Sequence, residues 1–353
     1  MLPQKDSERL RLGMLGAGPI AQFGHLEAAA KSRNVDLFAL CDIAEALLDS
    51  LRAFYRVATT YTDYEAMLAD PKVEAVLIAT SDAFHVPAAR LALRAGKHVL
   101  VEKPLGVTSA ECHELIDLAE QTGLVCQVGH MKRFDPGVRA ARHFAQHDLG
   151  EMIAYKGWYC DSTLRYDQTD SVHPVHHVSA NARKPNTDPK ADLATYYLLA
   201  HGSHLIDTAL FLNGPIRSLR ARLVERSGMY NWFVDAQFQN GSNGHLDLTV
   251  AVRDDWREGF LLYGTAGTVE GKIYNPWYFK PAEVRCFRQN RSAYEQPLDN
   301  RAHFYQLQLE SFADAILHGK PQTGTTLREG LAVVETLEAI ADSSRTRGEI
   351  ELR

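Results

Sequence analysis

The chain has 353 residues, of which 45% are hydrophobic and 23% are charged, and these proportions exclude collagen-like, disordered and disulfide-scaffold proteins. Its 38 basic and 44 acidic residues give a formal net charge of −6, so it lacks the basic surface of a nucleic-acid-binding protein. No apolar run approaches the roughly 20 residues of a membrane span, and the charged N-terminus has no apolar signal-peptide core. We therefore expect a cytoplasmic protein without membrane or nucleic-acid partners. The five cysteines show no CxxC or zinc spacing, so we expect reduced thiols and no metal.

The first 130 residues alternate short apolar runs with amphipathic stretches. Strands are expected at residues 10–15, 35–41, 74–79, 99–101 and 125–128, and helices at residues 20–31, 44–54, 85–94 and 109–122. The patterns T-D-Y-E at 62–65 and T-S-A-E at 108–111 predict capping boxes at helix starts. Strands that alternate with helices at this spacing indicate βαβ units, with a parallel sheet that has helices on both faces.

Beyond residue 150 the pattern changes. Strands are expected at residues 151–160, 216–226, 232–238, 244–252 and 260–263, and helices at residues 196–212, 304–317 and 328–343. The dipeptide Asn240-Gly241 predicts a hairpin between two of these strands. The polar, His- and Pro-rich stretch 161–192 is expected to be an irregular surface excursion. A helix followed by several sequential strands indicates an α+β domain with a mostly antiparallel sheet.

Residues 16–21 match the pattern G-x-G-x-x-A directly after a predicted strand and at the start of a predicted helix. In a dinucleotide-binding loop, the first glycine allows a tight turn and the second lets the backbone approach the pyrophosphate. Ala21, in the third position, lets the helix lie close to the strand. The phosphates then meet N–H groups at the helix N-terminus. The same pattern also occurs in strand-to-helix turns that bind nothing, so it needs a second feature beside it.

Asp42 supplies that feature. It ends the next predicted strand, at the place of the acid that holds the adenosine ribose hydroxyls. A carboxylate there repels the additional 2′-phosphate of NADP, and Ile43 and Ala44 offer no cation to offset the repulsion. We therefore expect NAD to be preferred over NADP.

Five further segments carry a family resemblance. They are A-T-S-D-A-F-H at 79–85, A-G-K-H-V-L-V-E-K-P at 95–104, V-G at 128–129, R-F-D-P at 133–136 and G-S-H-L-I-D at 202–207. Together they resemble the Gfo/Idh/MocA oxidoreductases, and the resemblance spans essentially the whole chain. It implies an α/β fold with an N-terminal Rossmann NAD-binding domain at residues 1–130. It also implies a C-terminal α+β domain at residues 131–353, with a large, mostly antiparallel open sheet that commonly forms a dimer or tetramer interface in the family.

The chain departs from the family pattern at two places. Ser81-Asp82 stand where the family usually has Pro-Asn, which touches cofactor contacts but not the fold. Ala200 stands where the family commonly has an aspartate, four residues before His204. One member of the usual Lys/Asp/His group is therefore missing.

Four residues are candidates for acid–base chemistry. Lys103 follows the end of a predicted strand, and a bound positive nicotinamide ring would disfavour its ammonium form. His204 can take a proton from a substrate hydroxyl near neutral pH. Asp207 and His201 lie three residues on either side of His204, so either could support it. The alternatives are a solvated lysine in a turn and histidines packed in an apolar helix.

The remaining site residues fall into two sets. The expected cofactor contacts are Gly16, Gly18, Pro19, Ile20, Asp42, Ile43, Thr80, Ser81, His85, Glu102, Lys103 and Met131. The expected substrate contacts are Arg133, Trp158, Tyr159, Arg165 and His176. His173, His176 and His177 cluster in the polar stretch, where surface histidines are favoured over a metal site because HExxH and CxxC patterns are absent.

From these features we expect an NAD-dependent dehydrogenase that transfers a hydride between the cofactor and a secondary alcohol or ketone of a sugar, glycoside or cyclic polyol. His204 or Lys103 would take the hydroxyl proton. Two alternatives stay open. One is a glycosidase that retains NAD and acts by transient oxidation and elimination, and the other is a non-catalytic regulator that senses a dinucleotide.

Overall fold

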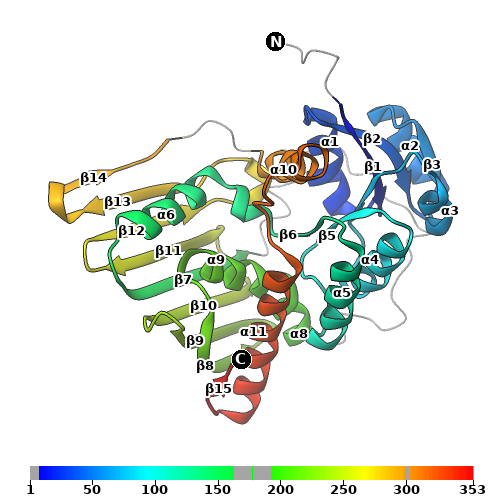
Figure 1. The fold of residues 1–353 in the computed structure, drawn as a ribbon. Coiled ribbons are helices and arrows are strands. Elements are labelled where there is room, and N and C mark those ends of the chain that lie inside the picture. Colours follow the sequence, from blue (N-terminus) through cyan, green and yellow to red (C-terminus); the bar gives the residue numbers. More distant parts are fainter. Residues whose placement is uncertain (1–7, 163–176, 178–191, 299–302, 353) are drawn as a thin grey trace. The chain divides into compact units, whose positions relative to one another are not determined.

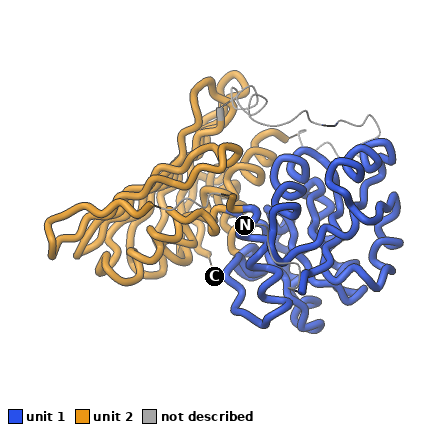
Figure 2. The backbone as a smooth tube through the Cα atoms, turned by 90° about the horizontal axis from the view of Figure 1, so that it is seen from above, with its two compact units in different colours: residues 1–131, 173–191, 305–331 blue, residues 132–172, 192–304, 332–353 orange. Residues whose placement is uncertain are grey.

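The computed structural model describes residues 8–162, 177, 192–298 and 303–352. The chain forms two compact units, coloured separately in Figure 2. The first unit comprises Met1–Met131, His173–Ala191 and Tyr305–Leu331, and the second comprises Lys132–Val172, Asp192–Phe304 and Ala332–Arg353. The predicted boundary between two domains, residues 1–130 and 131–353, stays a prediction.

The first unit contains a six-stranded sheet in the order β3-β2-β1-β4-β5-β6, and all five strand pairs are parallel (Figure 1). The strands are β1 (Leu10–Leu15), β2 (Val35–Cys41), β3 (Thr59–Tyr61), β4 (Ala75–Ile78), β5 (His98–Glu102) and β6 (Cys126–Gly129). The helices are α1 (Leu26–Lys31), α2 (Glu45–Tyr55), α3 (Tyr64–Ala69), α4 (His85–Arg94), α5 (Ser109–Thr122) and α10 (Phe304–His318). This order is that of a Rossmann fold, so the prediction of an N-terminal dinucleotide-binding fold is confirmed.

The starts of two helices test the capping patterns. Thr108 accepts a hydrogen bond from the Glu111 backbone N–H and forms the predicted capping box at α5. At α3 the prediction is wrong, because Asp63 rather than Thr62 caps the helix and accepts from the Ala66 N–H at 2.9 Å. Aspartate is at least as good an N-cap as threonine, so the helix begins one residue later than predicted. Strand β3 was not predicted, because its three residues are all half-buried and show no apolar run.

The second unit contains a nine-stranded sheet in the order β14-β13-β12-β11-β7-β10-β9-β8-β15. Its strands are β7 (Met152–Ser162), β8 (Ile216–Arg226), β9 (Met229–Phe238), β10 (Asn243–Val252), β11 (Arg257–Gly264), β12 (Gly267–Ile273), β13 (Glu283–Arg288), β14 (Ala293–Glu295) and β15 (Ile350–Glu351). Every pair is antiparallel except β7 with β10. The predicted hairpin at Asn240-Gly241 joins β9 to β10, with Gly241 at φ +87°. The large, mostly antiparallel sheet is thus confirmed.

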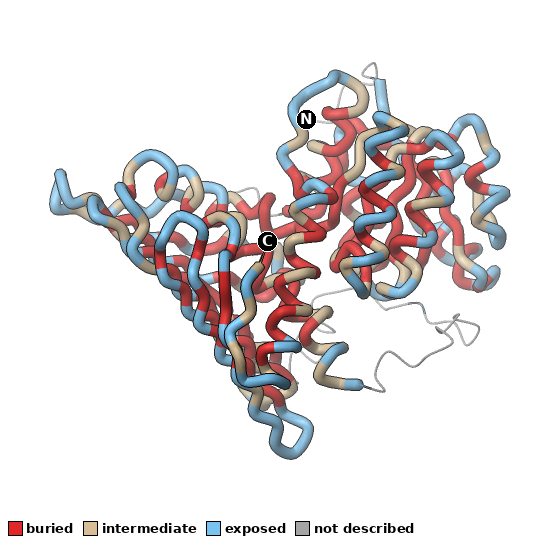
Figure 3. The backbone as a smooth tube through the Cα atoms, turned by 60° about the horizontal axis from the view of Figure 1, so that its bottom comes forward, coloured by how far each residue is buried: buried red, intermediate tan, exposed pale blue. Residues whose placement is uncertain are grey.

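Among the residues that the structure describes, helices cover one face of this sheet. They are α6 (Pro136–His147), α8 (Leu193–Tyr197), α9 (Ser203–Asn213) and α11 (Leu327–Thr346), and in Figure 1 α6, α9 and α11 lie across the same side. Strand β9 shows this difference between the faces, because Trp232 and Val234 are buried while the alternate residues Phe233 and Asp235 are exposed. The same alternation of red and pale blue runs along the strands in Figure 3. The second face is therefore open, as an antiparallel sheet allows.

Two helices contain a π-helical turn, which holds one more residue than an α-helical turn. The first, Ala21–His25, precedes α1 directly after the glycine loop. The second, Leu198–Gly202, joins α8 to α9. Both predicted helices, 20–31 and 196–212, are thus real but contain an irregular turn. No helix among the described residues is long and apolar enough to span a bilayer.

Candidate functional site

The glycine loop has the backbone geometry that its sequence predicts. Gly16 has φ +93°, and a Cβ at this position would lie 2.6 Å from the carbonyl oxygen of Ala79. A residue with a Cβ does not fit there. A Cβ on Gly18 would meet nothing within 4 Å, so the backbone at Gly18 is open to an approaching group. The loop therefore has the tight turn and the open second glycine that a pyrophosphate needs.

Asp42 lies beside this loop at the carboxyl end of β2. Its Oδ2 accepts from the Ala17 N–H at 2.9 Å, and its Oδ1 accepts from the Ala44 N–H at 3.0 Å. Two backbone donors thus fix the carboxylate against the loop. Ile43, the next residue, is 46% exposed. This end of β2 therefore presents a carboxylate and an apolar side chain.

The loops that follow β4 and β5 are joined by His85. Its ring is fully buried, with Nδ1 2.7 Å from the Pro104 carbonyl oxygen and Nε2 3.2 Å from the Thr80 carbonyl oxygen. Both neighbours are acceptors, so a neutral ring donates its one N–H to one of them, while the other nitrogen lies against the second backbone segment. Thr80 is half-buried and Ser81 is exposed at the same edge of the sheet. Of the expected cofactor contacts, His85 is therefore a buried residue that lies against both loops.

Glu102 and His25 form a buried pair next to Lys103. Nε2 of His25 lies 2.7 Å from Oε1 of Glu102, and both side chains are almost fully buried. Oε2 of Glu102 accepts from the backbone N–H of Lys103 at 3.0 Å. Burial opposes the ionised carboxylate, but the hydrogen bond and charge of His25 outweigh it and hold the pKa of Glu102 below its usual value. An ionised Glu102 thus positions the backbone of Lys103, whose side chain is half-buried.

In the second unit, Tyr159 is the centre of a cluster on the covered face of the sheet. Its ring stacks on His204 with the two planes 4° apart and the centroids 5.9 Å apart. Its hydroxyl oxygen lies 3.4 Å from Nδ1 of His201. On the other side of His201, Nε2 lies 3.5 Å from Oδ2 of Asp161, and both side chains are buried. The described structure thus brings both predicted histidines to one tyrosine.

A buried ion pair lies against the same tyrosine. Tyr159 on β7 stands opposite Glu258 on β11 in the strand register, and Lys132 pairs with Glu258. The Lys132 ammonium lies 4.7 Å from the centroid of the Tyr159 ring, which is cation–π distance. Burial raises the pKa of Glu258 above its usual value, although Lys132 acts in the opposite direction.

Arg133 and Asp207, predicted to bind substrate and to support His204, form a second buried ion pair. Nε of Arg133 lies 2.9 Å and 3.2 Å from the two oxygens of Asp207, and its Nη2 lies 2.8 Å from Oδ1. Both side chains are at most 3% exposed. The charges of these two residues therefore satisfy each other inside the unit, which makes them part of its packing.

Trp158, another predicted substrate contact, lies outside this cluster. Trp158 and Tyr159 point to opposite faces because side chains alternate along a strand, and Trp158 lies against Gly259. Arg165 and His176 lie outside the described residues, as does His173. His177 is described, and its backbone pairs with the side-chain amide of Gln22. Among the described residues no group of three or more metal-ligating side chains forms, and the expectation of no metal stays a prediction.

Sequence reasoning missed Asp161, His25, Lys132 and Glu258. Only Asp161 left a local signal, because it stands two residues after Tyr159, just beyond the predicted strand 151–160, and it shares the face of Tyr159 because β7 extends to Ser162. The pairings of Lys132 with Glu258 and of His25 with Glu102 join segments 126 and 77 residues apart, which a linear pattern does not reveal.

Comparisons with known proteins agree with this geometry. Residues 10–130 match the model of an oxidoreductase family with an NAD-binding Rossmann fold, and residues 139–270 match the GFO/IDH/MocA C-terminal domain. An inositol 2-dehydrogenase of Salmonella typhimurium is 25% identical over 346 residues, covering 96% of this chain and 95% of that protein. A D-xylose 1-dehydrogenase (NADP(+)) of Haloferax volcanii is 25% identical and covers 97% of this chain and 100% of that protein. The structure of GenD2 from gentamicin A biosynthesis in complex with NAD has a TM-score of 0.77 at 25% identity, over 99% of this chain and 98% of that one.

The ion pair of Arg133 with Asp207 predicts a loss of stability on substitution. Asp207→Asn leaves a buried guanidinium without its charge partner, and we expect the free energy of unfolding to fall by about 3 kcal/mol. Chemical denaturation followed by circular dichroism measures the change. Asp342→Asn removes an exposed carboxylate that pairs with Arg345, and it should change the value by less than about 0.5 kcal/mol. Equal stability of the two variants would contradict the structural role of Asp207.

Proposed function

The chain belongs to the Gfo/Idh/MocA family of oxidoreductases, and from this premise we propose that it oxidises a secondary alcohol of a sugar, glycoside or cyclic polyol with NAD. The observation that carries the proposal is the occurrence, in one chain, of two features. The first unit has a glycine loop with an adjacent acid, and the second has a buried cluster of acid–base side chains. The relatives named as inositol and xylose dehydrogenases support the substrate class.

The residues of the first unit would hold the cofactor at one edge of the parallel sheet. The carboxyl ends of β1, β2, β4 and β5 meet at that edge, and they carry the glycine loop, Asp42, Thr80 and Lys103. When bound, NAD accepts a hydride at its nicotinamide ring. Lys103 follows β5, with its backbone fixed by Glu102, and can exchange a proton with a hydroxyl group.

The residues of the second unit would bind the polyol and take its proton. The polyol would bind beside this cluster, in which the buried rings of Tyr159 and Trp256 pack edge to face with their centroids 5.1 Å apart. His204, stacked on Tyr159, can accept the hydroxyl proton as the C–H bond is broken. Either His204 or Lys103 is the principal base, and the pH profiles of variants distinguish them.

Cofactor absorbance during turnover tests the function itself. We expect a panel of sugars, glycosides and cyclic polyols to include compounds that yield a ketone with stoichiometric NADH. Product without net NADH would identify the glycosidase that retains its cofactor. Binding of NAD with no product from any compound would identify the dinucleotide-sensing regulator.

Cofactor preference follows from Asp42. We expect NAD to bind at least about tenfold tighter than NADP, because the fixed carboxylate would repel the 2′-phosphate. Asp42→Ser combined with Ile43→Arg should shift the preference toward NADP, whereas Asp36→Ser, on an exposed position of the same strand, should not. Fluorescence titration with both dinucleotides measures this, and equal affinities in the wild type would contradict the proposal.

Loss of either candidate base should slow turnover. Lys103→Ala is expected to lower kcat about 100-fold or more while the Kd for NAD stays within a few fold, and His204→Ala should lower kcat by about 10² to 10⁴. If His204 is the base, an ionisation near neutral pH disappears from the pH–rate profile of His204→Ala; if it persists, Lys103 takes that role. Lys31→Ala, at an exposed position of α1, is the control. Normal turnover of both Lys103→Ala and His204→Ala would overturn the acid–base assignment.

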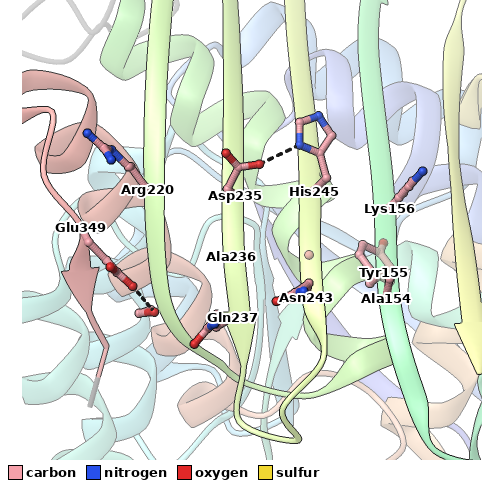
Figure 4. A pocket seen from close by; sticks show the side chains of 12 residues that line it. Ala154, Tyr155, Lys156, Arg220, Asp235, Ala236, Gln237, Asn243, His245 and Glu349 are labelled. Atoms are coloured by element: carbon pink, nitrogen blue, oxygen red, sulfur yellow. Dashed lines mark hydrogen bonds and ion pairs between the residues drawn. The ribbon is translucent and has the colours of Figure 1, made fainter.

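We also propose that copies of the chain associate through the open face of the nine-stranded sheet, in the cytoplasm. That face carries an exposed Phe233 and a polar hollow, shown in Figure 4, where Nδ1 of His245 lies 3.0 Å from Oδ1 of Asp235. None of the five cysteines, all of which lie in the described part of the chain, forms a disulfide, which suits a reducing compartment.

Sedimentation velocity tests the association. We expect a dimer or tetramer, and Phe233→Glu should shift it toward the monomer because a charge would be buried in the contact. Phe54→Glu, at a 66% exposed position of the first unit, should not. A monomeric wild type at micromolar concentration would exclude the association.

A further inference from the structure

The second unit contains a buried carboxylate that the proposed function does not yet use. The family resemblance implies an aspartate at position 200, where this chain has an alanine. Asp161, on β7 rather than on the helix, is only 5% exposed and faces His201. Asp207 on α9 is held by Arg133, so its charge is already balanced by that guanidinium.

We propose that Asp161 and His201 are positioning residues for Tyr159 and His204, with Asp161 taking the place of the carboxylate missing at Ala200. This inference rests on the proposed function, because the residues that it positions are those that would bind and deprotonate the polyol. Asp161 and His201 would not contact the polyol themselves and would act through Tyr159 and His204.

The atoms in contact define how the proton on His201 is placed. In the proposed arrangement Asp161 is an ionised carboxylate, which only accepts hydrogen bonds, so Nε2 of His201, 3.5 Å from Oδ2 of Asp161, would carry the proton. The other nitrogen, Nδ1, then accepts from the hydroxyl of Tyr159. The Tyr159 ring is thereby held parallel to His204. A neutral side chain at position 161 would no longer select this tautomer.

The π-helical turn Leu198–Gly202 explains how His201 reaches the sheet. His201 lies inside this turn and is buried, while its neighbour Ala200 is half-buried. The ring of Tyr197, from α8, lies 5.8 Å from the His201 ring and lines it on another side. The turn therefore directs a histidine, instead of residue 200, at the carboxylate of β7.

The other charges around the cluster compensate each other. Among the described residues, the titratable and charged groups that face His201 or the Tyr159 ring beside it are Asp161, Tyr159, Tyr197, His204, Lys132 and Glu258. Lys132 and Glu258 neutralise each other as an ion pair. Among the described residues, Asp161 is thus the carboxylate that lies next to the His201 ring outside this ion pair.

Nitrogen NMR of the histidine rings tests the placement without any turnover. In protein labelled with ¹⁵N-histidine, we expect His201 to be the Nε2–H tautomer at neutral pH in the wild type. In Asp161→Asn this preference should weaken, and in Asp161→Glu, which keeps the carboxylate, it should return. The His201→Gln variant assigns the signal. A wild-type His201 protonated at Nδ1 would overturn the proposal.

Kinetics then test whether the placement matters for the reaction. Asp161→Asn should lower kcat at least about tenfold with KM within a few fold, and Asp161→Glu should recover most of the loss. The double variant Asp161→Asn/His201→Gln should be no slower than the slower single variant, because both act through one path. Asp342→Asn, an exposed carboxylate of the same unit, should leave kcat unchanged.

The two sets of results separate the possible failures. The expected tautomer together with an unchanged kcat in Asp161→Asn would overturn the positioning role while the proposed function stands. If no compound is turned over by the wild type, the proposed function fails, and the NMR comparison still decides whether Asp161 sets the tautomer. Thermal melting of each variant identifies unfolding, and Asp161→Glu provides the test if Asp161→Asn does not fold.

Discussion

Alternation of side chains across the nine-stranded sheet is the constraint on which the second unit depends. Neighbouring residues of a strand point to opposite faces, and the helices of the described part of the chain cover one of those faces. Tyr159 and Asp161 therefore enter the interior together, while Trp158 and Cys160 face the other way. The antiparallel register of β7 with β11 then sets Glu258 beside Tyr159. A shift of one residue in β7 would send Tyr159 and Asp161 to the open face, away from the histidines that they contact.

Buried charges make both candidate sites stiff. Removing a charge from water costs several kcal/mol unless a partner and hydrogen bonds compensate it. The compensated pairs among the described residues include His25 with Glu102, Lys132 with Glu258, and Arg133 with Asp207. Glu102 accepts a hydrogen bond from the backbone N–H of Lys103, and Lys132 lies over the ring of Tyr159. Lys103 and Tyr159 both have proposed roles. Rigid pairs of this kind hold the backbone of a reactive side chain in place while the side chain itself keeps its freedom.

Most of the helices and strands could be predicted from local patterns in the sequence. Strand β1 and helix α4 were predicted with the bounds that the structure has, because an apolar run and an amphipathic stretch are each read within one segment. The glycine loop and Asp42 were likewise predictable, since the two lie on successive strands of one βαβ unit. The contact of His201 with Asp161 was not, because it depends on an irregular helical turn and on strand register. The interpretation of Asp207 as a supporter of His204 used helix spacing alone, and its pairing with Arg133 comes from a distant segment.

The two π-helical turns have a consequence for how related chains can differ in length. Successive side chains of an α-helix are rotated by about 100° about the helix axis. Removing one residue from Leu198–Gly202 would convert the turn to a regular one and rotate everything before it relative to α9. His204 would keep its place on α9, and a different residue would face Asp161. A single-codon deletion or insertion here thus exchanges the partner of a carboxylate without altering any neighbouring strand, and Ala21–His25 offers the same exchange at Glu102.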